Sequence, residues 1–300
     1  MPGSRASVFG EAEDFQAALS ADGVAEMLIT SRDQFRARLT QVGLERLRLA
    51  AVEESQSRIS FIVVPPGMVL VTFAIEKMPS PVWGGIEIRA SEIVTFGPGE
   101  RLHAKSVGPC HWGAIWVPYR QLADYGPALS GTGFVVPPAA RWQPSRAAMK
   151  ELRDLHQAAI RIAEARAGAV TDLQAVHGLE HQLLHALIEC LSEAGEKETA
   201  TSRRHRDMLA RFEDLLVAEP LPRIRTICAA LGVSDRLLTE CCKQHLGIGP
   251  IRYSHLRAMQ TVHHALRSGT PKTTTVSEVA RRHGFHALGR LAANYRAVYG

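Results

Sequence analysis

The sequence predicts an α+β protein with an N-terminal antiparallel β barrel or sandwich, accompanied by helices, and a C-terminal all-α domain with two helix-turn-helix units. Three observations carry this prediction. Short strand-like runs separated by turns precede residue 118, helical periodicity begins after residue 144, and an internal repeat occupies the last hundred residues. A chain of 300 residues is long enough for two domains, because single cores usually stop growing near 100 to 200 residues.

Strand-like runs fill residues 35–117. The clearest are Arg58–Val64, Met68–Ala74, Gly85–Ile88, Ile93–Phe96 and Trp112–Val117. Turns rich in proline and glycine separate them, which is typical of an antiparallel sandwich or barrel. A barrel of this size can hold one small ligand. We select Trp83 and Trp112 as candidate pocket residues because each adjoins a glycine and a polar turn.

Helices are expected in the next part of the chain, after a connection over residues 131–144 and an N-cap at Ser145. A helix is expected over about 170–193, with leucines at four-residue spacing. This spacing fits either an internal core or a dimer seam. The leucines are Leu179, Leu183, Leu187 and Leu191. Residues 193–202 are small, charged and aperiodic, as in a linker. The predicted organisation is an N-terminal domain over 1–192, this linker, and a C-terminal domain over 203–300.

Charge is unevenly distributed along the chain. The net charge is +5, but residues 201–300 contain 16 Lys and Arg against 7 Asp and Glu, so the last third carries +9 and the rest −4. A basic C-terminal segment joined to an acidic N-terminal part indicates that the C-terminal segment binds a polyanionic partner. Five cysteines without a Cys-x-x-Cys pair favour a reducing compartment. No secretion signal or membrane-spanning apolar stretch is visible, so we expect a cytoplasmic protein with no membrane partner.

The strongest signal is the internal repeat. The first copy reads Ile227-Cys228-x-x-x-Gly232-Val233 and continues with Leu238, Cys242 and Gly247; the second reads Val279-Ala280-x-x-x-Gly284-Phe285 and continues with Leu291, Tyr295 and Gly300. In each copy a small residue permits a close helix crossing, a glycine permits the positive φ of a turn, and an apolar residue fills the corner. Ser234 is a good N-cap for the helix that follows. These features predict two helix-turn-helix units.

A helix is expected between the two units, over residues 250–268, where apolar residues recur at helical spacing. Such a helix spans about 28 Å, which is close to the ~34 Å repeat of B-DNA. The second helix of each helix-turn-helix unit, called its reading helix below, would contact the bases. The two reading helices could therefore enter successive major grooves on one face of double-stranded DNA.

Three further motifs are Gly232-Val233-Ser234-x-Arg236-x-Leu238, His245-Leu246-Gly247-x-x-Pro250-x-x-Tyr253 and Val276-x-Glu278-Val279-Ala280-x-x-x-Gly284-Phe285. With them, residues 203–300 resemble the AraC/XylS family of transcriptional regulators, and residues 286–296 resemble the subgroup that includes ethanolamine-utilisation regulators. The chain departs from the family at Cys241-Cys242 and at Leu291, where phenylalanine is usual, so looser packing of both reading helices is expected.

The resemblance implies a DNA-binding regulator, more often an activator than a repressor, that is not an enzyme and uses no cofactor. It also implies that the β domain is cupin-like and that it senses a small-molecule effector or mediates homodimerisation. An activator of this kind would in addition contact RNA polymerase.

The resemblance also assigns DNA-contact candidates. Arg236 and Arg290 are favoured for base readout, because a guanidinium reads guanine with two hydrogen bonds. The other base-edge candidates are Thr239 and Glu240 in the first unit and His286 and Gly289 in the second. Phosphate contacts are expected from helix N-termini, near Ser234 and Asp235, and from the cations Lys243, Arg252, Arg257, Lys272 and Arg296.

An alternative interpretation is a metal-dependent cupin-like protein or a metal sensor. His177, His181 and His185 recur at four-residue spacing, and two histidines four apart on a helix can bind a transition metal. Histidines on an exposed helix face are more often plain polar surface, so this remains the second choice. The sequence shows no Ser-His-Asp order, P-loop or dinucleotide-binding glycine motif, so an enzyme is not expected.

Overall fold

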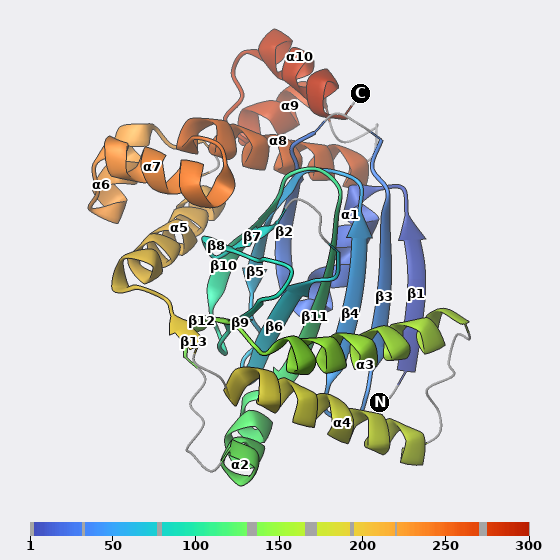
Figure 1. The fold of residues 1–300 in the computed structure, drawn as a ribbon. Helices are drawn as coiled ribbons and strands as arrows, with labels where there is room; N and C mark the ends of the chain where they lie inside the picture. Colours follow the sequence, from blue (N-terminus) through green and yellow to red (C-terminus); the bar gives the residue numbers. More distant parts are fainter. Residues whose placement is uncertain are drawn as a thin grey trace.

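The protein consists of a β sandwich followed by a group of helices that packs on one side of it (Figure 1). The computed structural model describes residues 3–31, 34–76, 80–130, 137–165, 173–192, 195–219, 221–269 and 275–299. Strand pairing in these ranges is antiparallel throughout both sheets.

The larger sheet has eight strands. In spatial order they are β1 (Gly3–Phe9), β3 (Ala37–Gly43), β4 (Arg48–Glu54), β11 (Cys110–Pro118), β6 (Met68–Ala74), β9 (Ile93–Phe96), β12 (Ala139–Trp142) and β13 (Gly195–Lys197). The central strands β6 and β11 are buried on both faces, because the second sheet covers one face and helices cover the other. They therefore appear in the sequence as nearly continuous apolar runs.

The smaller sheet has five strands. In spatial order they are β2 (Val24–Ile29), β5 (Arg58–Val63), β10 (Arg101–Ser106), β7 (Val82–Trp83) and β8 (Ile86–Glu87). Between the two sheets lies an apolar core in which the rings of Trp83 and Trp112 meet edge to face, with centroids 5.0 Å apart. Helix α1 (Ala12–Leu19), followed by one 3-10 turn (Ser20–Asp22), adds the buried side chains of Phe15 and Leu19 to this core.

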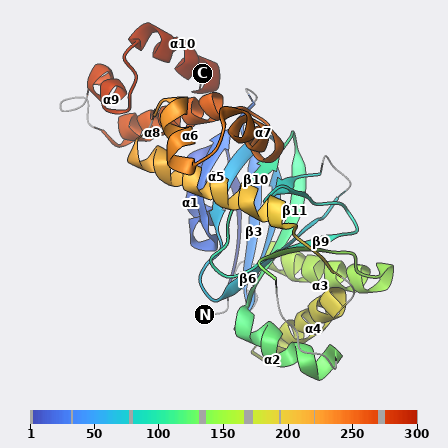
Figure 2. The ribbon, with the colours of Figure 1, turned by 90° about the vertical axis from the view of Figure 1, so that its left-hand side faces the viewer.

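Helices α3 (Arg146–Ala165) and α4 (Leu173–Ser192) cover the outer face of the larger sheet, with α2 (Tyr119–Ser130) beside them. Figure 2 shows them on the side of the sandwich away from the C-terminal helices. The leucine stripe of α4 belongs to this core: Leu183, Leu187 and Leu191 are buried and Leu179 packs against them. These leucines pack within the chain, as the core interpretation expected.

The structure has regular elements where the sequence predicted none. β1, α1 and β2 precede residue 35, and β12 lies inside the expected connection over 131–144. β13 lies inside the expected linker, and its backbone pairs with β12, from Ala140–Lys197 to Trp142–Gly195. Three- and four-residue strands carry too few residues for a recognisable alternation of apolar and polar side chains. The domain boundaries themselves remain a prediction.

Six helices form the described residues of the C-terminal part: α5 (Ala200–Ala218), α6 (Ile224–Leu231), α7 (Asp235–Leu246), α8 (Pro250–Ser268), α9 (Val276–Arg282) and α10 (Leu288–Tyr299). They enclose two separate apolar clusters. The first joins α5, α6, α7 and the start of α8, and the second joins the rest of α8 to α9 and α10. The predicted fold class, an antiparallel β sandwich followed by a helical domain, is confirmed.

The helical domain packs on the outer face of the smaller sheet. Leu28 of β2 and Ile59 of β5 belong to the same apolar cluster as α5, α6 and α7. Gly85, between β7 and β8, has φ +84°, and a Cβ there would lie 2.4 Å from the ring of His245 on α7. Only glycine permits this contact without displacing the ring. The position of the first helix-turn-helix unit is therefore set by the β sandwich.

Candidate nucleic-acid interface

The first helix-turn-helix unit consists of α6 and α7. Gly232 ends α6 in the left-handed conformation, with φ 70°, and Ser234 caps α7 by accepting a hydrogen bond from the Leu237 amide at 3.2 Å. Both features follow the sequence prediction, because a turn with positive φ favours glycine and a free helix amide favours a hydroxyl acceptor.

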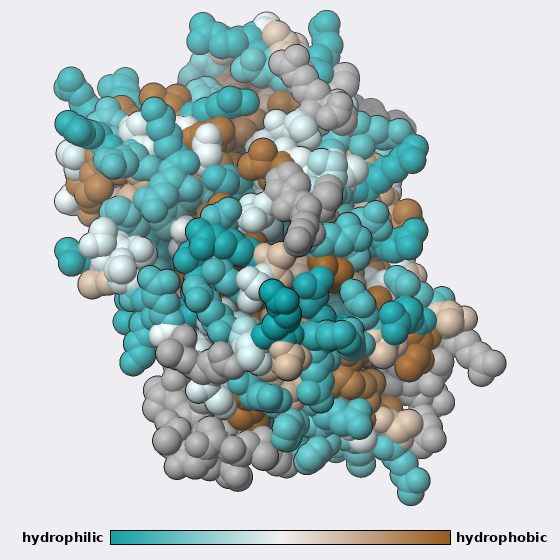
Figure 3. Space-filling view, viewed as in Figure 1, coloured by the Kyte–Doolittle hydropathy of each residue, from teal (hydrophilic) through white to brown (hydrophobic). Residues whose placement is uncertain are grey.

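One face of α7 is open to solvent. Arg236, Glu240 and Lys243 are exposed along it, and the hydroxyl of Thr239 donates to the Asp235 carboxylate at 3.2 Å. These five residues line one shallow groove. Figure 3 shows hydrophilic side chains over much of the helical end of the molecule. The buried side of α7 holds Leu238 and both adjacent cysteines, so the other face is free to meet a partner.

The second unit consists of α9 and α10. Thr275 caps α9 by accepting from the Glu278 amide at 3.3 Å, and Gly284 forms the turn with φ 83°. His286, Gly289 and Arg290 are exposed at the start of α10. The start of α10 and its Arg290 side chain therefore face solvent together, as is required of a helix that enters a DNA groove.

Helix α8 joins the two units and has the bounds that the sequence predicts, Pro250–Ser268. Arg252 is exposed on it. Arg257 differs from the expectation, because it is only 7% exposed and forms ion pairs with Glu26 and Glu213. It is therefore not free to contact phosphate in this arrangement. Lys272 lies outside the described residues.

Arg257 belongs to a buried polar cluster that ties the two domains together. Glu213 of α5 is at its centre: it accepts from His103 of β10 at 2.8 Å, from Arg257 at 3.1 Å and from the Tyr253 hydroxyl. Arg257 also reaches Glu26 of β2 at 2.9 Å. Burial would raise the pKa of the Glu213 carboxyl, but His103, Arg257 and Tyr253 lower it to about 2. The carboxylate is therefore ionised, and it accepts hydrogen bonds from residues of both domains.

The remaining candidates lie elsewhere. Trp83 and Trp112 are each 2% exposed within the core of the sandwich, where the Trp112 indole donates to Glu54 at 3.0 Å. His177, His181 and His185 are exposed on α4, and His177 pairs with Glu45 at 2.8 Å. Within the described ranges there is no group of three or more His, Cys, Asp or Glu residues that could hold a metal ion. None of the described helices is long and apolar enough to span a bilayer.

Comparison with known proteins concerns mainly the C-terminal part. Residues 227–300 match the family model described as a helix-turn-helix domain. Over 68 residues the chain is 34% identical to the XylDLEGF operon transcriptional activator 2 of Pseudomonas putida, a match that spans 23% of this chain and 43% of that protein. The XylDLEGF operon transcriptional activator of the same organism is 31% identical over 68 residues, which span 21% of its length. The chain therefore covers less than half of each relative, and the match identifies this segment as a helix-turn-helix domain.

Two solved structures extend over most of the chain. The AraC-like transcriptional activator CuxR has 13% identity and a TM-score of 0.46, with 92% of this chain and 98% of that chain covered. ToxT from Vibrio cholerae has 10% identity and a TM-score of 0.30, with 85% and 95% covered.

Proposed function

We propose that this chain is a transcription regulator of the AraC/XylS type that binds double-stranded DNA with α7 and α10. The observation that carries the proposal is the pair of helix-turn-helix units, each presenting an exposed arginine on its second helix, at the two ends of α8. A helix of 19 residues spans about 28 Å. That length suits two reading helices that enter successive major grooves.

The proposal gives the exposed residues separate roles. Arg236 and Arg290 read bases, with Thr239, Glu240, His286 and Gly289 beside them. Lys243, Arg252, Lys272 and Arg296, with the N-termini of the helices near Ser234 and Asp235, contact phosphate. Arg257 is left out of this set, because its guanidinium is buried between the domains.

Replacing Arg236 or Arg290 with alanine is expected to weaken binding to the specific site by about 1–3 kcal/mol each, because each removes a side chain that can read guanine. The measurement is a titration of the full chain against DNA from upstream of its own coding sequence and against a scrambled duplex, at several salt concentrations. Arg120→Ala, an exposed arginine on α2, is the matched control and should leave specific binding unchanged.

The titration also separates specific from general binding. A steep salt dependence with equal affinity for both duplexes would mean that the basic domain contacts only the phosphate backbone of DNA. That result would contradict the assignment of the two arginines to base readout. Absence of binding to either duplex would contradict the proposed function as a whole.

Finer assignments complete the proposal. The relatives named above are transcriptional activators, which supports activation, and contact with RNA polymerase, as the output here. The sandwich is proposed to respond to a small-molecule effector and to mediate homodimerisation, since its domain is joined to the DNA-binding helices through buried contacts that a ligand or partner could bias. The similarity of residues 286–296 to ethanolamine-utilisation regulators stays a prediction about the subgroup.

A further inference from the structure

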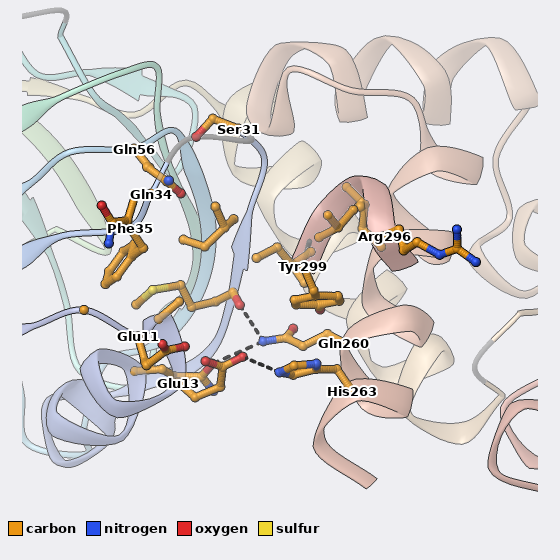
Figure 4. A pocket seen from close by; sticks show the side chains of 18 residues that line it. Glu11, Glu13, Ser31, Gln34, Phe35, Gln56, Gln260, His263, Arg296 and Tyr299 are labelled. Carbon is orange, nitrogen blue, oxygen red and sulfur yellow. Dashed lines mark hydrogen bonds and ion pairs between the residues drawn. The ribbon is translucent and has the colours of Figure 1, made fainter. Parts of the chain in front are cut away.

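The exposed faces of the two reading helices differ in charge. Helix α10 contains two arginines and no acidic residue, and Figure 4 shows the guanidinium of Arg296 directed away from a cavity between α10 and the sandwich. Helix α7 instead exposes two carboxylates and two cations, whose charges cancel. They are Asp235, Glu240, Arg236 and Lys243. A neutral face gains little from the phosphates of DNA, so we expect α7 to depend on contacts with bases.

The two carboxylates of α7 differ in their surroundings. Asp235 lies in the first turn, where a negative charge is favourable to the helix dipole, and it accepts a hydrogen bond from the Thr239 hydroxyl at 3.2 Å. Glu240 lies in the middle of the helix, and among the described residues its carboxylate has neither a hydrogen bond nor an ion pair. Helix stability therefore accounts for Asp235 but not for Glu240.

Glu240 lies in a row with Arg236 and Lys243. Residues at spacings of four and three share one face of a helix, and these three border the same shallow groove on α7. Arg236 and Glu240 are separated by about 6 Å along the helix axis, which is close to two base-pair steps of ~3.4 Å. The two side chains can therefore reach neighbouring base pairs when α7 lies in a major groove.

The chemistry of a carboxylate limits what Glu240 can contact in that groove. An ionised carboxylate only accepts hydrogen bonds, and the phosphates of DNA repel it. The donors in the major groove are the amino groups of cytosine and adenine, but the adenine amino group lies beside the N7 acceptor, which repels a carboxylate. Cytosine presents its amino group without that acceptor. The base that fits Glu240 is therefore cytosine.

We propose that Glu240 is a specificity-determining residue whose carboxylate accepts a hydrogen bond from the amino group of a cytosine in the DNA site. The inference rests on the proposed function, since it needs α7 in a major groove, and it adds the base that this helix selects. Where the cytosine is absent, the carboxylate is left unpaired next to acceptors and phosphates. Glu240 therefore raises the affinity for the correct site and lowers the affinity for unrelated DNA.

Selection from a random duplex library tests this assignment, with the full chain as wild type and as Glu240→Gln. The half-site of α7 is the one that Arg236→Ala alters, and the wild type is expected to enrich a cytosine at one position in it. Glutamine both donates and accepts, as adenine recognition requires. The variant should therefore enrich adenine at that position and leave the rest of the site unchanged.

Titrations give the size of the effect. Four duplexes that differ only at that position should show an advantage for cytosine on the order of tenfold with the wild type, and none with Glu240→Ala. With a scrambled duplex the sign is reversed: Glu240→Gln should bind it more tightly than the wild type, because a charge that phosphate repels is removed. Glu189→Gln, an exposed carboxylate on α4, is the matched control and should change neither affinity.

Other results would overturn the inference. Tighter binding of Glu240→Gln to every duplex alike would make Glu240 a general repulsive charge, and a cytosine preference that persists in Glu240→Ala would assign the base to another residue. Selection by the wild type without any cytosine in the half-site would also overturn it. In each of these cases the proposed function stands, because a sequence is still selected. A wild type that enriches no sequence contradicts both.

Discussion

Alanine in place of Glu213 is expected to lower the free energy of unfolding by about 3–5 kcal/mol, the usual cost of removing one partner from a buried ion pair. Glu213 is 2% exposed and accepts hydrogen bonds from His103, Tyr253 and Arg257, none of which is more than 7% exposed. Without the carboxylate, the largely buried Arg257 guanidinium would keep, among the described residues, the ion pair with Glu26, whose side chain is 32% exposed.

Urea unfolding of wild type and variant at neutral pH measures this effect. Glu240→Ala is the matched control, because it removes a carboxylate that is exposed on α7, and it should change the free energy of unfolding by less than about 0.5 kcal/mol. Equal stability of the two variants would mean that the buried cluster contributes nothing to holding the domains together.

The cluster also explains how the sandwich positions the helix-turn-helix units. Glu213 lies on α5 and Arg257 on α8, while His103 and Glu26 belong to the smaller sheet. Because the same carboxylate contacts both helices and the sheet, α5 and α8 cannot move apart from the sandwich without exposing unpaired charge. The contacts therefore hold α8, which carries a helix-turn-helix unit at each end, against the smaller sheet.

The helix-turn-helix units could be predicted because their determinants are local. Gly232 and Gly284 adopt positive φ within a few residues of the helices that they separate, and Ser234 caps its own helix. The linking helix matched its predicted bounds for the same reason, since Pro250 begins it and apolar residues recur along it.

The interdomain contacts could not be predicted, because they join residues that are far apart in the sequence. His103 and Glu213 are 110 positions apart, and Gln260 is 233 positions from Met27. No spacing rule relates such residues. Arg257 illustrates the consequence: as one cation among many in a basic domain it suggests a phosphate contact, and only its carboxylate partners from two other elements show that it is structural.

Acidification is expected to destabilise the protein through His156 of α3. The side chain is fully buried against the ring of Phe73, and its Nε2 lies 3.1 Å from the carbonyl oxygen of Ala50. Burial disfavours the charged imidazolium and lowers the pKa from 6.5 to about 4. The unfolded chain therefore binds a proton at this residue below about pH 6.5, whereas the folded chain does not until about pH 4. Stability falls across that window, by about 3 kcal/mol at its acidic end, and is unaffected above it.

Unfolding of wild type and His156→Gln at pH 7.5 and at pH 4.5 tests this expectation. Glutamine cannot take up a proton, so the variant should lose less stability on acidification than wild type, even if it is less stable at pH 7.5. His181→Gln, on the exposed face of α4, should lose as much as wild type. His245 is also buried, with its pKa lowered to about 4 by burial, so the His156 variant should retain part of the acid sensitivity. An unchanged loss in His156→Gln would mean that the folded protein protonates this imidazole as readily as the unfolded chain does.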